Sequence, residues 1–285
     1  MLRYFNPQLH HLLNLLILLF VAKEYAYLYL NWKEIFFLLI FSAIFEMGLS
    51  KLFLKKVKVK IYSAFTTAIG IILMLYSTHL WLYLILIFLA LAQKYLIKVQ
   101  DRHIFNPSNF SIFILLLFFN SYGGVSAGTL GHSSYALILV IVLGIFILVR
   151  VNRWIIPLGF MIFYTLFEML LIDQNTLIFE DLFERFYSVS FILFALFMVT
   201  DPLTTPKTPL NQTIFAILLS LSAALFDKFY GIRVEHIFLA LTLISPITLL
   251  LEESKLKEFI MIEAILTVLI FFTLSKEFIF MGVPL

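Results

Sequence analysis

The chain is built mainly from apolar runs that recur at roughly the spacing a bilayer imposes, since a helix needs roughly 20 apolar residues to cross the hydrocarbon core. Composition agrees with this pattern: 62% of the 285 residues are hydrophobic, 33 of them are Phe, and only 13% are charged. We therefore expect an all-α, polytopic membrane protein with a single transmembrane domain over residues 1–285. A soluble enzyme and a nucleic-acid-binding protein are both disfavoured.

The longest runs predict ten spans that are each long enough to cross a membrane. They are residues 11–31, 33–49, 61–77, 79–98, 134–150, 153–171, 183–200, 211–227, 233–251 and 257–274. One further run, 109–121, is shorter. A helix of about 12 residues is only about 18 Å long, whereas the hydrocarbon core of a bilayer is about 30 Å thick. This segment is therefore a half-length or tilted helix. The expected total is 10–11 transmembrane helices.

Positive charges gather in alternate loops. With the N-terminus inside, the inner face receives these Lys and Arg residues, out of 20 in the chain: Arg3, Lys51, Lys55, Lys56, Lys58, Lys60, Lys94, Lys98, Arg102, Arg150, Arg153, Lys207, Lys255 and Lys257. The positive-inside rule then predicts a multi-pass protein with a cytoplasmic N-terminus. The cluster at 51–60 suits anionic lipid headgroups as well as a protein partner.

Three carboxyl groups fall inside predicted spans, where ionisable groups are candidates for function. Glu46, Glu168 and Glu263 all lie towards helix ends. We expect their side chains to reach the headgroup region, which argues against a proton wire built of central carboxylates.

The chain contains no Cys and six His. It therefore supplies no iron–sulfur ligands, no thiolate zinc site and no disulfide. The histidines, among them the adjacent pair His10 and His11, lie near predicted helix ends without the spacing of metal ligands, so we expect no metal site. Any redox chemistry would need a bound organic cofactor or the metal of a partner.

Two polar stretches interrupt the apolar runs. In DRHIFNPSNFS, residues 101–111, Asn106 precedes Pro107, and in MVTDPLTTPKTP, residues 198–209, Asp201 precedes Pro202. Asn or Asp before Pro favours a helix N-cap followed by the first helical residue. Each break leaves helix-end backbone groups that a membrane tolerates only inside protein or beside a watery cavity. The alternative is a pair of well-capped loops at the inner surface.

A third segment, SAFTTAIGIILML at 63–75, places Ser63, Thr66 and Thr67 on one helical face, and Gly70 would allow a close helix contact. Sliding the chain on itself by 133 positions lays Thr67 over Thr200 and aligns HIF at 103–105 with HIF at 236–238. Such a repeat would run in the opposite direction through the membrane, as in inverted-repeat transporters.

The order SAFTTAIGIILML, HIFNPSNFSI, FMVTDPLTTP and GIRVEHIFLALTLISPITLLLEE resembles the RnfD/NqrB family. This family comprises membrane subunits of Rnf electron-transport complexes and of the Na⁺-translocating NADH:quinone oxidoreductase. The resemblance covers about residues 35–252. It implies two inverted five-helix repeats with discontinuous helices 3 and 8, and it makes the helix at 257–274 an addition to that core.

The resemblance also implies site residues. It places an ion or substrate path at the two discontinuous helices: Thr66, Thr67, Thr200, Asp201, Thr204 and Thr205. It makes Asn106 and Asn109 of the HIFNPSN motif candidates for contacts in a cofactor pocket. The expected partners are Na⁺ or H⁺ and other membrane subunits.

The loop GGVSAGTLGHSS at 123–134 corresponds to the place where family members esterify FMN to a Thr. Here Thr129 stands in S-A-G-T-L, with Gly and Ala in reversed order and a shortened loop after it. Thr129 is thus either a residue that carries covalent FMN or an ordinary turn residue. FMN or riboflavin held without a covalent bond is a third alternative, because Gly-rich loops leave backbone N–H groups for phosphate.

Two functions remain open at this point. The first is a membrane subunit of an RnfD/NqrB-like translocase complex, which couples flavin-mediated electron transport to cation transport, with or without a catalytic role of its own. The second is a small-solute or ion channel or transporter on the same inverted-repeat scaffold without redox activity.

Overall fold

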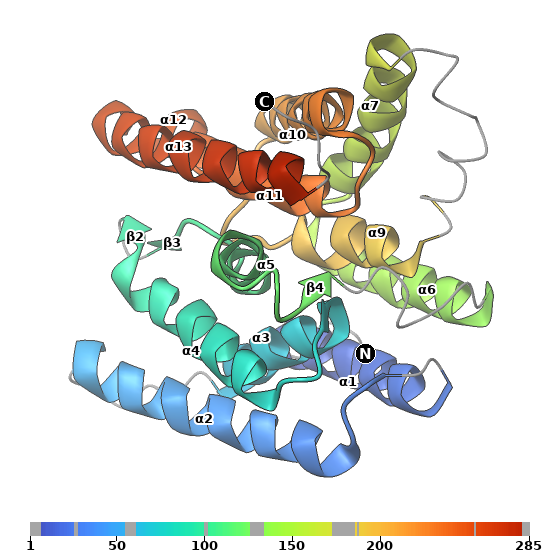
Figure 1. Ribbon diagram of the computed structural model, residues 1–285, viewed down its shortest axis with the longest axis vertical. Helices are drawn as coiled ribbons and strands as arrows, with labels where there is room; N and C mark the ends of the chain where they lie inside the picture. The colour runs from blue at the N-terminus through green and yellow to red at the C-terminus, as the bar shows by residue number, and fades with distance from the viewer. Residues whose placement is uncertain are drawn as a thin grey trace.

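The fold is a bundle of helices, shown in Figure 1. The computed structural model describes residues 7–25, 28–54, 61–99, 102–125, 134–172, 186, 188–253 and 255–280. The helices in these ranges are α1 (Pro7–Tyr25), α2 (Trp32–Leu54), α3 (Ile61–Met74), α4 (Leu80–Leu96), α5 (Pro107–Phe118), α6 (Ser134–Val151), α7 (Ile155–Leu171), α9 (Val189–Leu193), the π-helical turn η2 (Phe194–Met198), α10 (Pro209–Tyr230), α11 (Glu235–Ile244), α12 (Ile247–Glu253) and α13 (Leu256–Phe280).

Extended backbone occurs in the described ranges only as two-residue pieces. Strand β1 (Leu75–Tyr76) pairs with β4 (Gly124–Val125), and β2 (Lys98–Val99) pairs with β3 (Arg102–His103), both antiparallel. The all-α fold expected from the sequence is confirmed.

The helices follow the predicted spans in order, with differences in detail. Helix α1 ends at Tyr25 rather than at residue 31, and the span expected at 183–200 contains the short helix α9 and the π-helical turn η2. The short helix expected at 109–121 is α5, which has 12 residues. In contrast, α3 is one uninterrupted helix from Ile61 to Met74 and continues into β1, although the resemblance implies a discontinuity there. The span expected at 233–251 is divided into α11 and α12 at Pro246, because Pro lacks the N–H that a continuous helix needs.

The helices form two halves whose internal contacts correspond. In the first half α2 packs on α4, α4 on α5, and α1 on α3; in the second half α7 packs on α10, α10 on α11, and α6 on α9 and η2. The halves meet where α1 contacts α6 and α5 contacts α11. Because each half contains five spans, an odd number, the second half runs through the membrane in the opposite direction to the first.

One hydrogen bond joins the two halves at equivalent positions. Asn109 Nδ2 in α5 donates to Thr242 Oγ1 in α11 at 2.8 Å, and these residues are 133 positions apart, the displacement found in the sequence. The same Nδ2 donates to Phe238 O at 3.2 Å. A contact between a residue and its repeat equivalent is expected beside a two-fold axis, so the axis passes near this bond.

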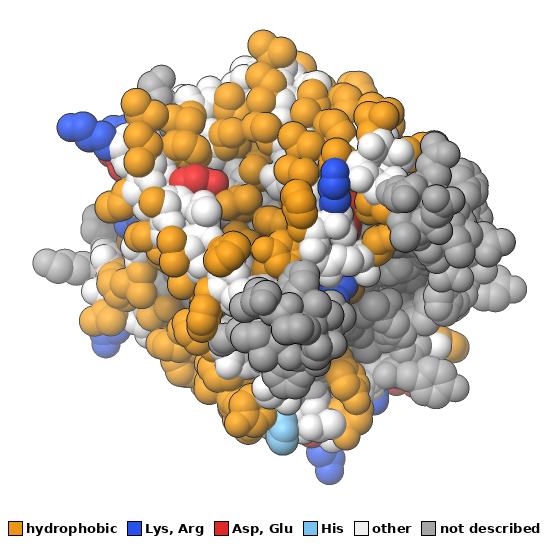
Figure 2. Space-filling model, turned by 45° about the horizontal axis from the view of Figure 1, so that its top comes forward, with side chains coloured by type: hydrophobic (Ala, Val, Ile, Leu, Met, Phe, Trp, Pro, Cys, Tyr) orange, Lys and Arg blue, Asp and Glu red, His pale blue; other side chains and the backbone are white. Residues whose placement is uncertain are grey.

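The outer surface is strongly apolar, and Figure 2 shows hydrophobic side chains over most of the visible face, with scattered charges. Exposed large residues follow the outward sides of α2, α7 and α13, for example Phe36, Ile162 and Phe271. Within the described ranges, four helical stretches of 18 residues or more are apolar enough to cross a membrane: Trp32–Leu54, Pro209–Tyr230, Glu235–Glu252 and Leu256–Ser275. The chain is therefore a multi-pass membrane protein whose apolar surface faces lipid.

Candidate functional site

The first polar break is the start of α5, and Asn106 organises it. Its Oδ1 accepts hydrogen bonds from the backbone N–H groups of Ser108 and Asn109 at 3.0 and 3.1 Å, so it caps the helix whose first residue is Pro107. Its Nδ2 donates to Met198 O at the end of η2, at 3.4 Å. The Asn106 side chain therefore caps the helix that follows the first break and also contacts the start of the second break.

The second break follows η2, where the chain leaves the helix at residues 199–208 before α10 begins at Pro209. Asp201 Oδ1 accepts from the Leu203 N–H at 3.0 Å, which stabilises the turn. Arg102 Nη2, from β3, donates to Leu203 O at 2.8 Å. The two breaks, 101 residues apart in the chain, thus lie side by side and are joined by hydrogen bonds.

A charge pair lies at this junction. His103 Nε2 is 3.7 Å from Asp201 Oδ2, and both side chains are largely buried. Burial alone would raise the pKa of the Asp201 carboxyl. The neighbouring His103 ring, together with the Leu203 N–H, outweighs burial and holds that pKa below its ordinary value. Asp201 is therefore a stable anion at neutral pH.

Helix α3 contributes the opposite wall. Thr66 and Thr67 both donate their hydroxyl protons to Ser63 O, at 3.0 and 2.9 Å. Ser108 Oγ donates to Thr67 O at 3.3 Å, which ties α5 to α3. A Cβ at Gly70 would lie 2.5 Å from Ser108 Oγ, so the close contact predicted at this glycine is confirmed.

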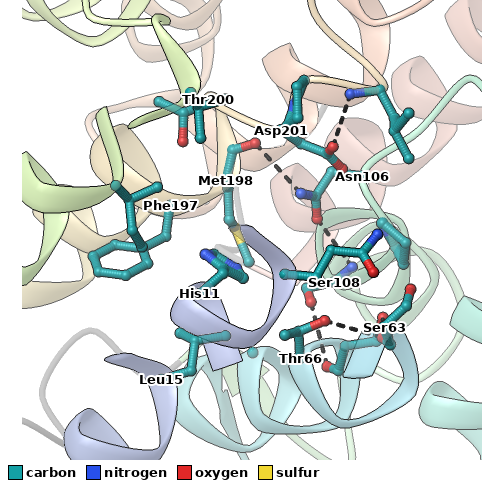
Figure 3. A pocket seen from close by; sticks show the side chains of 18 of the residues that line it. His11, Leu15, Ser63, Thr66, Asn106, Ser108, Phe197, Met198, Thr200 and Asp201 are labelled. Carbon is teal, nitrogen blue, oxygen red and sulfur yellow. Dashed lines mark hydrogen bonds between the residues drawn. The ribbon is translucent and has the colours of Figure 1, made fainter. Parts of the chain in front are cut away.

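These elements surround a cavity of about 620 Å³, which Figure 3 shows from close by. Five of the predicted site residues line it: Thr66, Thr67, Asn106, Thr200 and Asp201. They come from α3, from the start of α5 and from the segment after η2. We call this space the central cavity, and the end of the bundle that contains it the cavity end.

The other predicted site residues do not line the central cavity. Asn109 uses its amide between α5 and α11, as described above. Thr205 and Thr204 donate to Asp201 O at 2.7 and 3.4 Å and so stabilise the turn that follows Asp201. Thr129 lies outside the described residues.

Comparison with family models gives a match over residues 118–261, to the NQR2, RnfD, RnfE family. The chain belongs to this family. The match begins at the end of α5 and includes the second break, while α3 and Asn106 precede it. Comparison with curated proteins gave no match to the chain. At the level of the family, the chain is a membrane subunit of the Rnf and Nqr type.

The lining also contains residues that the sequence did not indicate for the site. His10 and His11, at the start of α1, and Phe197, in η2, all border the central cavity. The rings of His11 and Phe197 have centroids 5.9 Å apart and form one aromatic wall. The position of the adjacent histidines near a predicted helix end indicated the membrane surface instead. Only the packing of α1 across the bundle onto α3 and α6 brings them to the cavity.

The expectation that membrane carboxylates reach the headgroups is wrong for two of them. Glu46 and Glu168 are 1% and 0% exposed. Glu46 accepts a hydrogen bond from Tyr95 Oη at 2.8 Å and lies 3.9 Å from Lys94 Nζ. Position along a helix indicated an end, but the helix face that carries each carboxyl is turned towards neighbouring helices.

The size and lining of the central cavity are typical of cofactor pockets. Such pockets commonly measure about 300–1,000 Å³ and combine apolar walls with few polar groups. Here the aromatic wall and Met198 supply apolar surface. Ser108 and His103 supply hydrogen-bonding groups.

Proposed function

We propose that this chain is the membrane subunit of an Rnf- or Nqr-type complex in which a flavin in the central cavity passes electrons and the polar lining beside it conducts Na⁺ or H⁺. The observation that carries the proposal is the meeting of the two polar breaks at one cavity of about 620 Å³. Neither break is a free surface turn, since Asn106, Arg102 and their backbone partners link them directly.

The need for a bound carrier follows from the sequence. The chain has no Cys and so supplies no iron–sulfur ligands. When bound, a flavin supplies both one-electron and two-electron chemistry. The residues of this chain would hold and orient it: His11 and Phe197 through their rings, and Ser108 and His103 through hydrogen bonds.

The cation path would use other oxygen atoms of the cavity lining. Asp201 supplies a negative charge, and the hydroxyl oxygens of Thr66, Thr67 and Thr200 supply neutral ligands. Hard cations such as Na⁺ bind through oxygen. Thr204, Thr205 and Asn109 would keep the walls of this path in place.

Two threonines provide a matched test. Thr200 and Thr205 are both buried, and each donates to a backbone carbonyl at 2.7 Å, to Leu196 O and to Asp201 O. Only Thr200 lines the central cavity. We expect Thr200→Val and Thr205→Val to reduce folded protein in membranes equally, and only Thr200→Val to reduce cation uptake driven by electron transfer in membrane vesicles. If both variants take up cations at the same rate per amount of folded protein, the proposed cation path along Thr200 is contradicted.

Flavin binding is tested on the purified chain. Acid extraction releases a noncovalent flavin, whereas fluorescence that persists in a denaturing gel and disappears in Thr129→Ala marks a covalent one. We expect about one flavin per chain in one of these two fractions. A chain free of flavin in both, whose reconstitution into liposomes gives solute uptake, would instead establish the transporter without redox activity.

The orientation belongs to the same proposal. The cavity end would face the cytoplasm of a bacterium, as the excess of Lys and Arg predicts, and other membrane subunits would cover parts of the apolar surface. A cysteine introduced at Lys207, an exposed position of the second break, should react with a membrane-impermeant thiol reagent only from the cytoplasmic side.

A further inference from the structure

A group of buried titratable side chains lies at the end of the bundle opposite the central cavity. Tyr164 and Glu168 are on α7, Asp227 is on α10 and His236 is on α11. Glu168 and His236 are 0% exposed, as is Tyr164, and Asp227 is 2% exposed. We call these four residues the Asp227 cluster. None of them is used by the proposed flavin and cation site.

Asp227 is held by three hydrogen bonds. Its Oδ1 is 2.7 Å from His236 Nδ1 and accepts from the Arg233 backbone N–H at 2.9 Å. Its Oδ2 accepts from Tyr164 Oη at 2.7 Å. Donors from α7, from α11 and from the loop between α10 and α11 thus converge on one carboxylate. Hydrogen bonds of this kind stabilise a carboxylate.

Glu168 has the opposite environment. It lies one helical turn beyond Tyr164, on the same face of α7, so its carboxyl group faces Asp227 and interacts with it. Neither oxygen of Glu168 has a hydrogen-bond donor among the described residues. Two carboxylates in contact inside a protein do not both stay ionised, because desolvation and like charge oppose it. The described residues thus leave the Glu168 carboxyl without a hydrogen-bond donor, and a bound cation, of which the smallest is a proton, would complete the pair.

The chemistry of the cluster favours a proton over Na⁺ or a divalent metal ion. A hard cation needs several free oxygen ligands, but both oxygens of Asp227 already accept hydrogen bonds. His236 contributes a ring nitrogen, which is a poor ligand for Na⁺. Among the described residues, no group of three or more acidic or His side chains is arranged to hold a metal ion.

We propose that Glu168, Asp227 and His236 form a proton-binding site, in which the two carboxyl groups share one proton and His236 exchanges it with the adjacent membrane surface. The end of α10 and the loop after it, residues 228–233, form the route to that surface, since Lys228, Phe229 and Gly231 are exposed. Among the described residues, the other titratable or charged groups near the site are Tyr230, whose ring is 6.5 Å from that of His236, Arg233 and Glu235. The inference does not rest on flavin binding.

The test is infrared difference spectroscopy on the full chain in lipid nanodiscs, which detects the C=O stretch of protonated carboxyl groups. We expect such a band at neutral pH in the unmodified protein and its loss in Glu168→Gln, because Asp227 then keeps its three donors and stays ionised. Glu46→Gln is the matched control. Glu46 is equally buried but lies beside Lys94, so its replacement should leave the band unchanged.

Further measurements keep the proposal falsifiable if Glu168→Gln does not fold. In the unmodified protein the C=O band must shift in frequency on exchange into D₂O. Its intensity must not change when Na⁺ is added at constant pH. Tyr164→Phe removes one donor from Asp227, and we expect it to change the pH at which the band titrates. Absence of the band, its persistence in Glu168→Gln, or its removal by Na⁺ would each overturn the proton site, and removal by Na⁺ would make it a cation site.

Discussion

Glu46 and Glu168 are both glutamates buried within membrane helices, but their neighbours differ. Glu46, at the cavity end, lies beside the Lys94 ammonium group and accepts a hydrogen bond from Tyr95. Lys94 also donates to Ser63 Oγ at 3.0 Å, which fixes its position between α2 and α3. Glu168, at the opposite end, faces another carboxyl group and has no donor among the described residues.

The difference separates two uses of buried charge. A carboxylate beside a fixed cation keeps its charge and holds helices together, and it is costly to disturb. A carboxyl beside a second carboxyl is able to change its protonation with little change in structure. The cavity end therefore has charges of fixed protonation around the central cavity. The Asp227 cluster, in contrast, has an exchangeable proton among buried side chains.

The largest effect should come from breaking the pair at the cavity end. Lys94→Met leaves the Glu46 carboxylate buried without its cation, and removing one partner of a buried pair costs about 3–5 kcal/mol. We expect a corresponding loss in the free energy of unfolding, measured by denaturant titration in detergent. The double variant with Glu46→Gln should recover most of it. Glu168→Gln should cost much less, because it replaces a neutral group by another of similar shape. If Lys94→Met and Glu168→Gln lower the free energy of unfolding equally, the two glutamates do not differ in the way described.

A smaller effect is expected from the cap of α5. Asn106→Ala removes the acceptor for the Ser108 and Asn109 N–H groups, and the loss of such a cap typically costs about 1 kcal/mol. Asn106→Asp keeps the acceptor and serves as the control. Hydrogen exchange should speed up in the first turn of α5 for the Ala variant only, and the amides of α10 and α11 near the Asp227 cluster should be unaffected. Faster exchange at both ends would show that the two ends are not independent.

The sequence alone predicted the spans and the two breaks because both depend on local features. Apolar runs fix where a helix crosses a bilayer, and Asn106–Pro107 is a helix start that needs no distant partner. The close approach at Gly70 was also predictable, since a residue without a side chain in an apolar helix favours contact with a neighbour.

The rest depends on which helix faces meet. His11 reaches the central cavity only because α1 packs across the bundle on α3 and α6. Glu168 and Asp227 are 59 residues apart, and their contact follows from the close packing of α7 on α10. The burial of Glu168 could not be predicted from its place near a helix end, because position along a helix does not determine which way a side chain points.

The smallest predicted effect is a pH dependence at the cavity end. The pKa of Asp201 is below its ordinary value in the folded protein, so its charge stabilises the fold at any pH above the ordinary Asp value of about 3.9. This contribution is lost as the pH falls from there through the lowered folded value. The stability difference between the unmodified protein and Asp201→Asn should therefore be constant in mildly acidic buffer and should narrow below about pH 4.

The Asp227 cluster provides the contrast for this last measurement. If Glu168 already carries a proton in the folded protein, unfolding releases that proton at any pH above the ordinary Glu value of about 4.3. The stability of the unmodified protein relative to Glu168→Gln should therefore rise as the pH falls towards about 4.3, and it should stay flat below that pH, where the Asp201→Asn difference narrows. Thermal unfolding in detergent at a series of acidic pH values measures both differences in one experiment. A Glu168→Gln difference that narrows together with that of Asp201→Asn would mean that Glu168 is ionised, and the two ends of the bundle would then hold their acids in the same way.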